Sequence, residues 1–249
     1  MITPRVTAEV AQRLNELANG DLISYHQYLD FVLCRSFRRT LLCNRALHLQ
    51  RDALVERIRK LWIASPVVRS AELSDGGYDF RSPSGASTYT TKDPIILPVL
   101  DHLQTIWPHA ERFDLLLERI SKGLSVELRQ RAAENLGHDL LVLAARAVVD
   151  LRSYPIPVAE IVTTHPTATP LGRIQAQEGA LVTTLLHTQV EIGDEQVRFL
   201  LHLLDGSRDR NALLREFVSH YPDASRQASA PQLDAVLNSF HRLGILSAS

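Results

Sequence analysis

Glycine is scarce in this chain, which has 11 glycines among 249 residues. Nowhere do two or three of them recur at the spacing that lets a backbone loop wrap a phosphate or a dinucleotide. The segment most similar to a cofactor-binding loop is 203–207, which has one acid and one glycine after apolar residues. The residues before it follow a helical pattern, which does not fit such a loop. The sequence therefore predicts no cofactor site.

Cysteine is scarcer still. Cys34 and Cys43 lie in a helical pattern at a spacing that places them on different sides of a helix, so we expect free thiols in a reducing compartment. With His48 they are the closest approach to a set of metal ligands, but a fourth ligand is missing. No two of the ten histidines stand at the i, i+4 spacing with an adjacent acid that builds a zinc site on a helix. We predict no metal site.

An excess of charge is also lacking, since 27 lysines and arginines face 28 aspartates and glutamates. No overall field would attract nucleic acid or an anionic membrane. Long apolar runs are missing too. The longest, residues 140–149, is interrupted by Arg146 and falls well short of the about 20 residues that span a bilayer, and residues 1–10 contain no apolar signal core. We expect a cytoplasmic protein without a membrane partner.

Apolar residues, in contrast, make up 45% of the chain, which excludes a disordered or fibrous protein. The segment 154–170 holds four of the twelve prolines and is the best candidate for a domain boundary. On each side of it the periodicity indicates three helices followed by a short strand, with a β ribbon supplied by flanking residues. The ribbon of the first side is expected from runs at 62–69, 78–81 and 87–90.

This order of elements is that of a winged helix. We therefore predict an α+β fold, predominantly α, in which an N-terminal helical segment (residues 1–55) precedes two tandem winged-helix-like units (residues 56–160 and 161–249). A winged helix that reads DNA presents cations and amides on its third helix. The last helix instead displays Asp234, Asn238, His241 and Arg242, and the third helix of the first unit mixes arginines with acids. Specific binding to nucleic acid is not expected.

The N-terminal segment changes character at residues 21–48. On a helical wheel, Leu29 and Leu33 belong to one apolar stripe, which continues through Phe37 and Leu41. A second stripe on the far side is interleaved with arginines. A helix that is apolar on two sides is packed on two sides, either within this protein or against another chain. Guanidinium groups among aromatic rings suit a protein interface. The candidate interface residues are Tyr28, Phe31, Val32, Arg35, Arg38 and Arg39.

These residues also carry a resemblance to a known family. The string Gln27-Tyr28-Leu29-Asp30-Phe31, Trp107-Pro108 and the segment 203–210 resemble, in order and spacing, the C-terminal region of bacterial methyltransferases that carry a regulatory domain, including protein lysine methyltransferases. The resemblance covers nearly the whole chain. It implies that the catalytic domain, which comes first in that family, is absent here. The chain departs from the family pattern at Arg39, where glutamine is usual, and at Arg146, where glycine is common.

The sequence thus favours a non-catalytic regulatory or substrate-recruiting module of a SAM-dependent protein methyltransferase, not an enzyme itself, that acts by protein contact. Its expected partners are a methyltransferase catalytic domain or subunit and a protein substrate, and a homodimer is an open alternative. The chain would be a fragment, the product of a split gene or a free-standing protein. The rival hypothesis is a winged-helix DNA-binding regulator. A third, an enzyme that uses His187 or His138, has no partner acid or nucleophile to support it.

Overall fold

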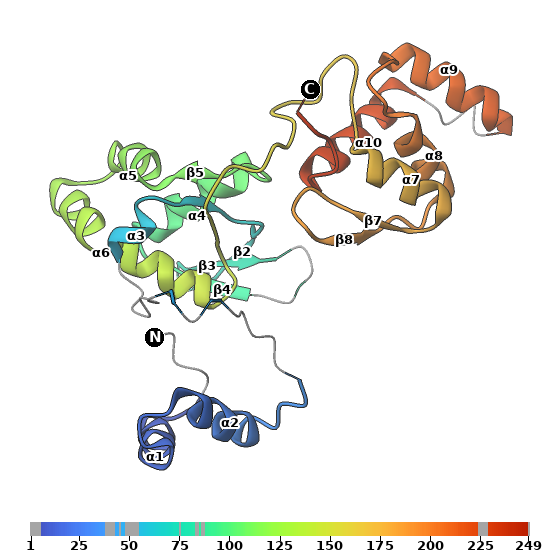
Figure 1. The fold of residues 1–249 in the computed structure, drawn as a ribbon. Helices are drawn as coiled ribbons and strands as arrows, with labels where there is room; N and C mark the ends of the chain where they lie inside the picture. The colour runs from blue at the N-terminus through green and yellow to red at the C-terminus, as the bar shows by residue number, and fades with distance from the viewer. Residues whose placement is uncertain are drawn as a thin grey trace. The chain divides into compact units, whose positions relative to one another are not determined.

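The computed structural model describes residues 6–37, 43–44, 46–47, 55–74, 76–82, 85, 88–223 and 229–248. The chain forms two compact units, residues 1–54 and residues 55–249. Helices dominate and the sheets are small, so the predicted α+β class with mostly α content is confirmed (Figure 1). Within the described residues, no helix is both long enough and apolar enough to cross a bilayer.

The N-terminal unit contains a helical hairpin of α1 (Ala8–Ala18) and α2 (Leu22–Val32). Thr7 caps the start of α1, and Asp21 caps α2 by accepting hydrogen bonds from the amides of residues 23 and 24. The turn between the helices uses left-handed backbone at Asn19 and Gly20. Four buried side chains hold the hairpin together: Leu14, Ala18, Tyr25 and Leu29.

The predicted helix over residues 21–48 is wrong at residues 33–37, because α2 ends at Val32, and residues 38–42, 45 and 48 lie outside the described residues. Cys34 has a φ of 50°, in the left-handed region. Its amide donates to the carbonyl of Phe31 at 3.1 Å, and the amide of Arg35 donates to the carbonyl of Asp30 at 2.9 Å. This pair of bonds is the Schellman motif, which satisfies carbonyls at a helix end. Glycine usually marks it, so a cysteine gave no signal in the sequence.

Residues 55–153 place four helices around a small antiparallel sheet. The helices are α3 (Val55–Ile58), α4 (Ile96–Ile106), α5 (Phe113–Ser121) and α6 (Val126–Ala145). The strands are β1 (Trp62–Ala64), β5 (Glu111–Arg112) and β6 (Asp150–Arg152), in the order β5-β1-β6. Ile63 at the centre pairs with Glu111 on one side and Leu151 on the other. The central strand, β1, therefore precedes helices α4, α5 and α6 in the sequence.

A second antiparallel sheet has the order β2-β3-β4, from strands β2 (Val68–Glu72), β3 (Tyr78–Arg81) and β4 (Thr88–Thr91). The sequence predicted one continuous run over 62–69, but β1 and β2 lie in different sheets. Pro66 stands between them and has no amide to donate to a ladder. The buried Ser65 donates its hydroxyl to the carbonyl of Val148 at 2.6 Å, which anchors the crossover.

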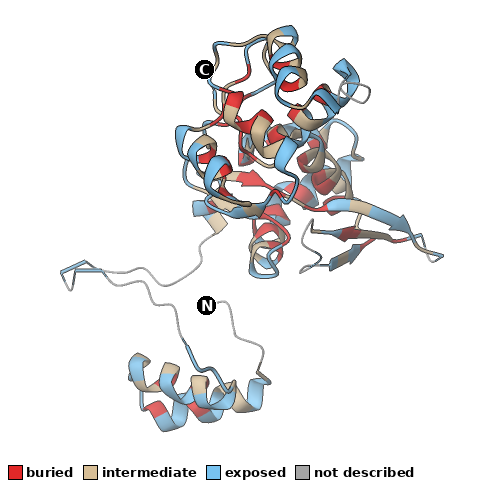
Figure 2. Ribbon diagram, turned by 90° about the vertical axis from the view of Figure 1, so that its right-hand side faces the viewer, coloured by how far each residue is buried: buried red, intermediate tan, exposed pale blue. Residues whose placement is uncertain are grey.

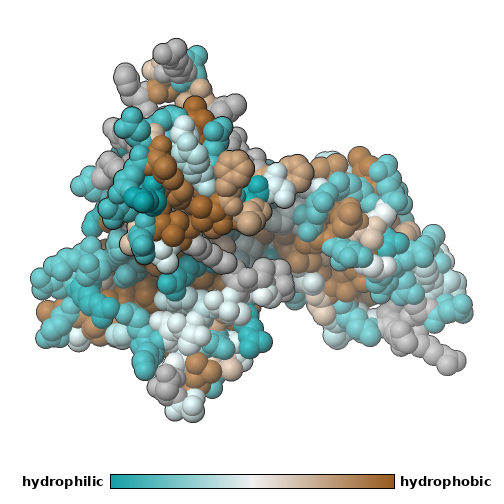
Figure 3. Space-filling model, turned by 90° about the horizontal axis from the view of Figure 1, so that it is seen from below, coloured by the Kyte–Doolittle hydropathy of each residue, from teal (hydrophilic) through white to brown (hydrophobic). Residues whose placement is uncertain are grey.

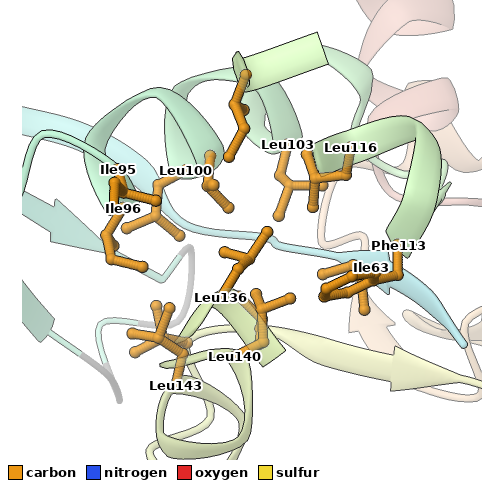
Figure 4. Packing of buried hydrophobic residues seen from close by; sticks show 14 of the residues in the cluster. Ile63, Ile95, Ile96, Leu100, Leu103, Phe113, Leu116, Leu136, Leu140 and Leu143 are labelled. Carbon is orange, nitrogen blue, oxygen red and sulfur yellow. The ribbon is translucent and has the colours of Figure 1, made fainter. Parts of the chain in front are cut away.

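The core of this region lies between α4, α5 and α6. Figure 4 shows Leu136, Leu140 and Leu143 of α6 on one side, facing Leu100 and Leu103 of α4. All five side chains are buried, and Ile63 and Phe113 close the cluster toward the sheet. The helical stripes that the sequence indicated for these three helices are therefore the buried ones, which appear in red along the inner helix faces in Figure 2.

Residues 154–248 repeat the same plan around a separate core. The elements are α7 (Pro170–Glu178), β7 (Leu181–Thr183), β8 (Gln189–Glu191), α8 (Glu195–Leu203), α9 (Arg210–His220) and α10 (Ala230–Arg242). Thr167 forms a β-bridge with Asp205, which follows α8 in the chain. Ala168 forms a β-bridge with Leu246, which follows α10. Both bridges are antiparallel, so a central segment again precedes three helices and pairs with residues beside them.

Candidate interaction surface

Helix α2 buries one of its two apolar faces. Its N-terminus is fixed by Asp21, whose carboxyl pKa is lowered by hydrogen bonds from the hydroxyl and amide of Ser24 and from the amide of Ile23. From this start, Tyr25 and Leu29 point toward α1. Leu29 is only 2% exposed. The first apolar stripe predicted from the sequence is thus the hairpin's own contact, as far as the helix extends.

The second stripe faces outward. Phe31 is 78% exposed. Tyr28 and Val32 lie within about 100° of Phe31 around the helix and are also exposed. We call Tyr28, Phe31 and Val32 the α2 apolar surface. Isolated exposed apolar residues are normal, but several on one helix face mark an interaction site. Figure 3 shows that some hydrophobic residues, drawn in brown, reach the surface among hydrophilic residues drawn in teal.

The predicted arginine cluster is only partly described. Arg35 follows α2, and its guanidinium lies 3.7 Å from the carboxylate of Asp30, so it is already paired on its own side of the hairpin. Arg38 and Arg39 lie outside the described residues. Phe37, which the sequence placed on the buried stripe, is exposed because the helix has ended before it. The structure therefore brings Tyr28, Phe31, Val32 and Arg35 together around the end of α2.

The candidate metal ligands and histidines of the sequence are dispersed in the described part of the chain. No group of three histidine, cysteine, aspartate or glutamate side chains in that part of the chain could hold a metal ion. His138 is exposed on α6, and His187 lies in the turn after β7 with a φ of 57°. These two histidines are on different elements with separate cores, so nothing joins them into one site. Cys34 and Cys43 are both exposed free thiols.

The segment 203–210, which contributed to the family resemblance, makes hydrogen bonds and ion pairs that connect neighbouring elements of the fold. Asp205 accepts hydrogen bonds from the hydroxyl and amide of Ser207 and from Arg208, and these bonds lower the pKa of its carboxyl. Arg208 also pairs with Glu216 at 2.7 Å. Arg210 donates to the carbonyl of Thr163 at 2.8 Å and pairs with Asp234 of α10 at 2.7 Å. The motif therefore fastens α9 and α10 to the segment before α7.

The helices that would read DNA have few free cations. On α6, Arg131 pairs with Asp93 at 2.6 Å, and Arg129 donates to the carbonyl of Leu124. On α10, Arg242 is the exposed arginine, and the acid Asp234 is engaged by Arg210. Free cations that contact phosphates supply a large share of the affinity of DNA-binding proteins, and on α6 these two arginines already have partners.

Sequence reasoning missed one cluster. His109, His241 and Trp107 meet beside the carbonyl of Ala159, although the histidines lie far apart in the sequence. Trp107 was noted only for the family resemblance, and neither histidine has a neighbour in the sequence that marks it. Only the tertiary fold brings them together.

The winged-helix class that the fold defines is supported by comparison with known proteins. Residues 165–232 match the family described as "PKMT, C-terminal winged helix domain". A winged-helix domain of the protein lysine methyltransferase type is therefore present in the second half of the chain, and the resemblance identified in the sequence is confirmed.

Two solved structures share the fold over nearly the whole chain. PKMT2 from Rickettsia typhi in complex with AdoHcy superimposes with a TM-score of 0.81 at 15% identity, covering 98% of this chain and 52% of that one. A second structure of PKMT2 gives 0.79 at 16% identity, covering 98% and 53%. An uncharacterized protein, RP789, from Rickettsia prowazekii (strain Madrid E) is 23% identical over 224 residues, which are 82% of this chain and 38% of that protein. The chain spans about half the length of the solved structures it matches.

Proposed function

We propose that this chain is a non-catalytic regulatory or substrate-recruiting module of a SAM-dependent protein methyltransferase, and that it acts by protein contact. The α2 apolar surface would dock a methyltransferase catalytic domain, and the winged-helix region would position a protein substrate. The observation that carries the proposal is the outward-facing second stripe of α2, which includes Phe31.

Two further observations support it. The chain corresponds to about half of PKMT2, so the other half of that protein is the kind of partner that a docking surface here would meet. On α6, Arg131 pairs with Asp93 and Arg129 donates to the carbonyl of Leu124, which disfavours the DNA-binding alternative for that helix.

The test is capture of a SAM-binding protein from cells of the source organism. The tagged chain is used as bait in an extract incubated with radiolabelled SAM and irradiated to cross-link it. The proposal expects wild-type bait to retain a SAM-labelled protein that mass spectrometry identifies as a methyltransferase. Phe31→Glu bait should lose it, whereas Leu17→Glu, which places the same charge at an exposed leucine of α1, should not.

Calorimetry provides the second arm. The purified chain is titrated with SAM in the absence of any other protein. Tight, stoichiometric binding would contradict a non-catalytic role, because it would place a methyl-donor site in this chain. Retention of the same methyltransferase by wild-type and Phe31→Glu bait would contradict the assignment of the docking surface.

A further inference from the structure

Two histidines from distant parts of the chain converge on one carbonyl. His109 follows α4, and His241 lies in the last turn of α10. The Nε2 atoms of the two rings lie 3.1 Å and 2.8 Å from the carbonyl oxygen of Ala159. A carbonyl only accepts hydrogen bonds, so both Nε2 atoms carry a hydrogen, and its two lone pairs allow both bonds at once. The ring centroids are 5.7 Å apart.

The same corner joins the helices of residues 55–153 to those of residues 154–248. The indole Nε1 of Trp107 donates at 2.9 Å to the carbonyl of Arg242, one of the carbonyls that the end of α10 leaves without a helical partner. The amide of Ala159 donates to the carbonyl of Leu246 at 3.0 Å, so the shared carbonyl is held in place by the chain end beyond α10. A hollow of about 810 Å³ borders these contacts, lined among others by Trp62, Glu111, Leu115, Pro155, Val158 and Glu160.

We propose that His109 and His241 form a pH-sensitive latch between the segment that carries α4 and the segment that carries α10. With His109 neutral, each ring donates one hydrogen bond to the shared carbonyl and the corner is closed. When His109 gains a proton, a positive charge stands on a half-buried ring beside Arg152 and the ring of His241. The latch then opens, and the two segments move apart.

The charges around the pair decide its response. Arg152 of β6 faces His109 and opposes a further positive charge, and it also donates to the carbonyl of Pro108 at 3.0 Å. Glu160, from the segment after β6, favours the charge. Glu111 of β5 lines the same hollow but is neutralised by bidentate hydrogen bonds from Arg119 and by contact with His102.

Taken together, the surroundings disfavour the protonated form of His109. Burial lowers the pKa of His109, and the nearby imidazole of His241 lowers it further, against the opposing effects of the Ala159 carbonyl and Glu160. An exposed histidine has a pKa of about 6.5. As pH falls below that value the open form binds a proton at His109 that the closed form does not, so the closed form keeps its full stability above about pH 6.5 and loses stability as pH falls from there to the depressed pKa of His109. Within that window the ratio of open to closed molecules rises by up to about tenfold per pH unit for this proton.

The experiment measures the distance between the two segments directly. Spin labels are placed on cysteines at the exposed positions Glu118 of α5 and Ser219 of α9, in the full chain with Cys34→Ser and Cys43→Ser. Pulsed electron spin resonance is recorded at pH 7.5 and pH 5.5. The wild-type pair should show a second, longer distance that grows at pH 5.5. The H109Q/H241Q variant, whose amides can still donate but never charge, should show the same distances at both values.

His138→Gln is the matched control, because it removes an exposed histidine of α6 and should leave the response intact. An unchanged wild-type distribution between pH 7.5 and 5.5 would overturn the latch, and so would an equal response in H109Q/H241Q. If the double variant is open at pH 7.5, NMR titration of the wild-type histidines decides. The latch requires the pKa of His109 to lie below that of an exposed histidine, and a His109 pKa at or above it would overturn the latch. None of these measurements needs a methyltransferase or any other partner.

Discussion

Phe31 and Leu29 stand two residues apart on α2 and should respond in opposite ways to truncation. A phenylalanine buries about 150–250 Å² when fully enclosed. Because Phe31 is 78% exposed, a partner that covers it would remove roughly 120–200 Å² from water. At about 25 cal/mol per Å², that contributes about 3–5 kcal/mol to association, or roughly two to three and a half decades in Kd. This is an upper range, since ordering and desolvation at the interface reduce it.

Phe31→Ala should therefore raise the Kd for the SAM-labelled methyltransferase by up to about two decades. Its free energy of unfolding should change by less than about 0.5 kcal/mol. Leu29→Ala should instead destabilise the hairpin by about 2–5 kcal/mol, because its side chain is buried against α1. Urea unfolding followed by circular dichroism and quantitative capture separate the two effects. Equal destabilisation by both variants, or normal capture by a folded Phe31→Ala protein, would refute the division of α2 into a buried and a docking face.

Three further predictions concern the 55–249 unit. Ala147→Gly should raise the free energy of unfolding by about 1 kcal/mol, because Ala147 has a φ of 55°. Gly244→Ala should lower the free energy of unfolding by at least as much, because Gly244, at the end of α10, has a φ of 68°. Thermal unfolding measures both changes. Arg210→Met should cost about 1–3 kcal/mol in urea unfolding, because the carbonyl of Thr163 and the carboxylate of Asp234 lose their donor. Fluorescence anisotropy with duplex DNA at about 50 mM salt should detect no binding, and steeply salt-dependent binding would restore the DNA-binding alternative.

Much of the helical fold could be predicted because its signals are local. The stripes of α5, α6 and α10 repeat at the helical period, and Asp194 and Gly244 mark a start and an end that the structure confirms. The errors have two different causes. The end of α2 uses a left-handed cysteine, which gives no signal in the sequence. The break between β1 and β2 is marked by Pro66, but the sequence alone does not show that the chain crosses to another sheet there, because that depends on the tertiary bond from Ser65 to Val148.

The candidate surface was predictable in part. Two apolar stripes on one helix indicate two contacts, and the structure shows which stripe the hairpin uses. The sequence could not show that the helix stops before Phe37, so it extended the buried stripe too far. The meeting of His109 and His241 depends on long-range packing, and no spacing or periodicity in the chain encodes it.

The repeated plan of residues 55–248 was visible in the order of elements but not in the residues that build it. In the first half, Ala147 occupies the left-handed position after α6, where Gly244 stands after α10. In both, the backbone amide of the next residue donates a hydrogen bond to the backbone carbonyl of a buried residue in the helix: Val148 donates to Leu143, and Ile245 donates to Phe240. Because the same cap leads from each third helix into the segment that pairs with the central one, the equivalence is one of backbone geometry. The latch, however, joins the end of the first helix in one half to the end of the third helix in the other. Such a contact between non-equivalent ends cannot follow from the repeat itself, so it needs residues of its own, and His109, Trp107 and His241 supply them.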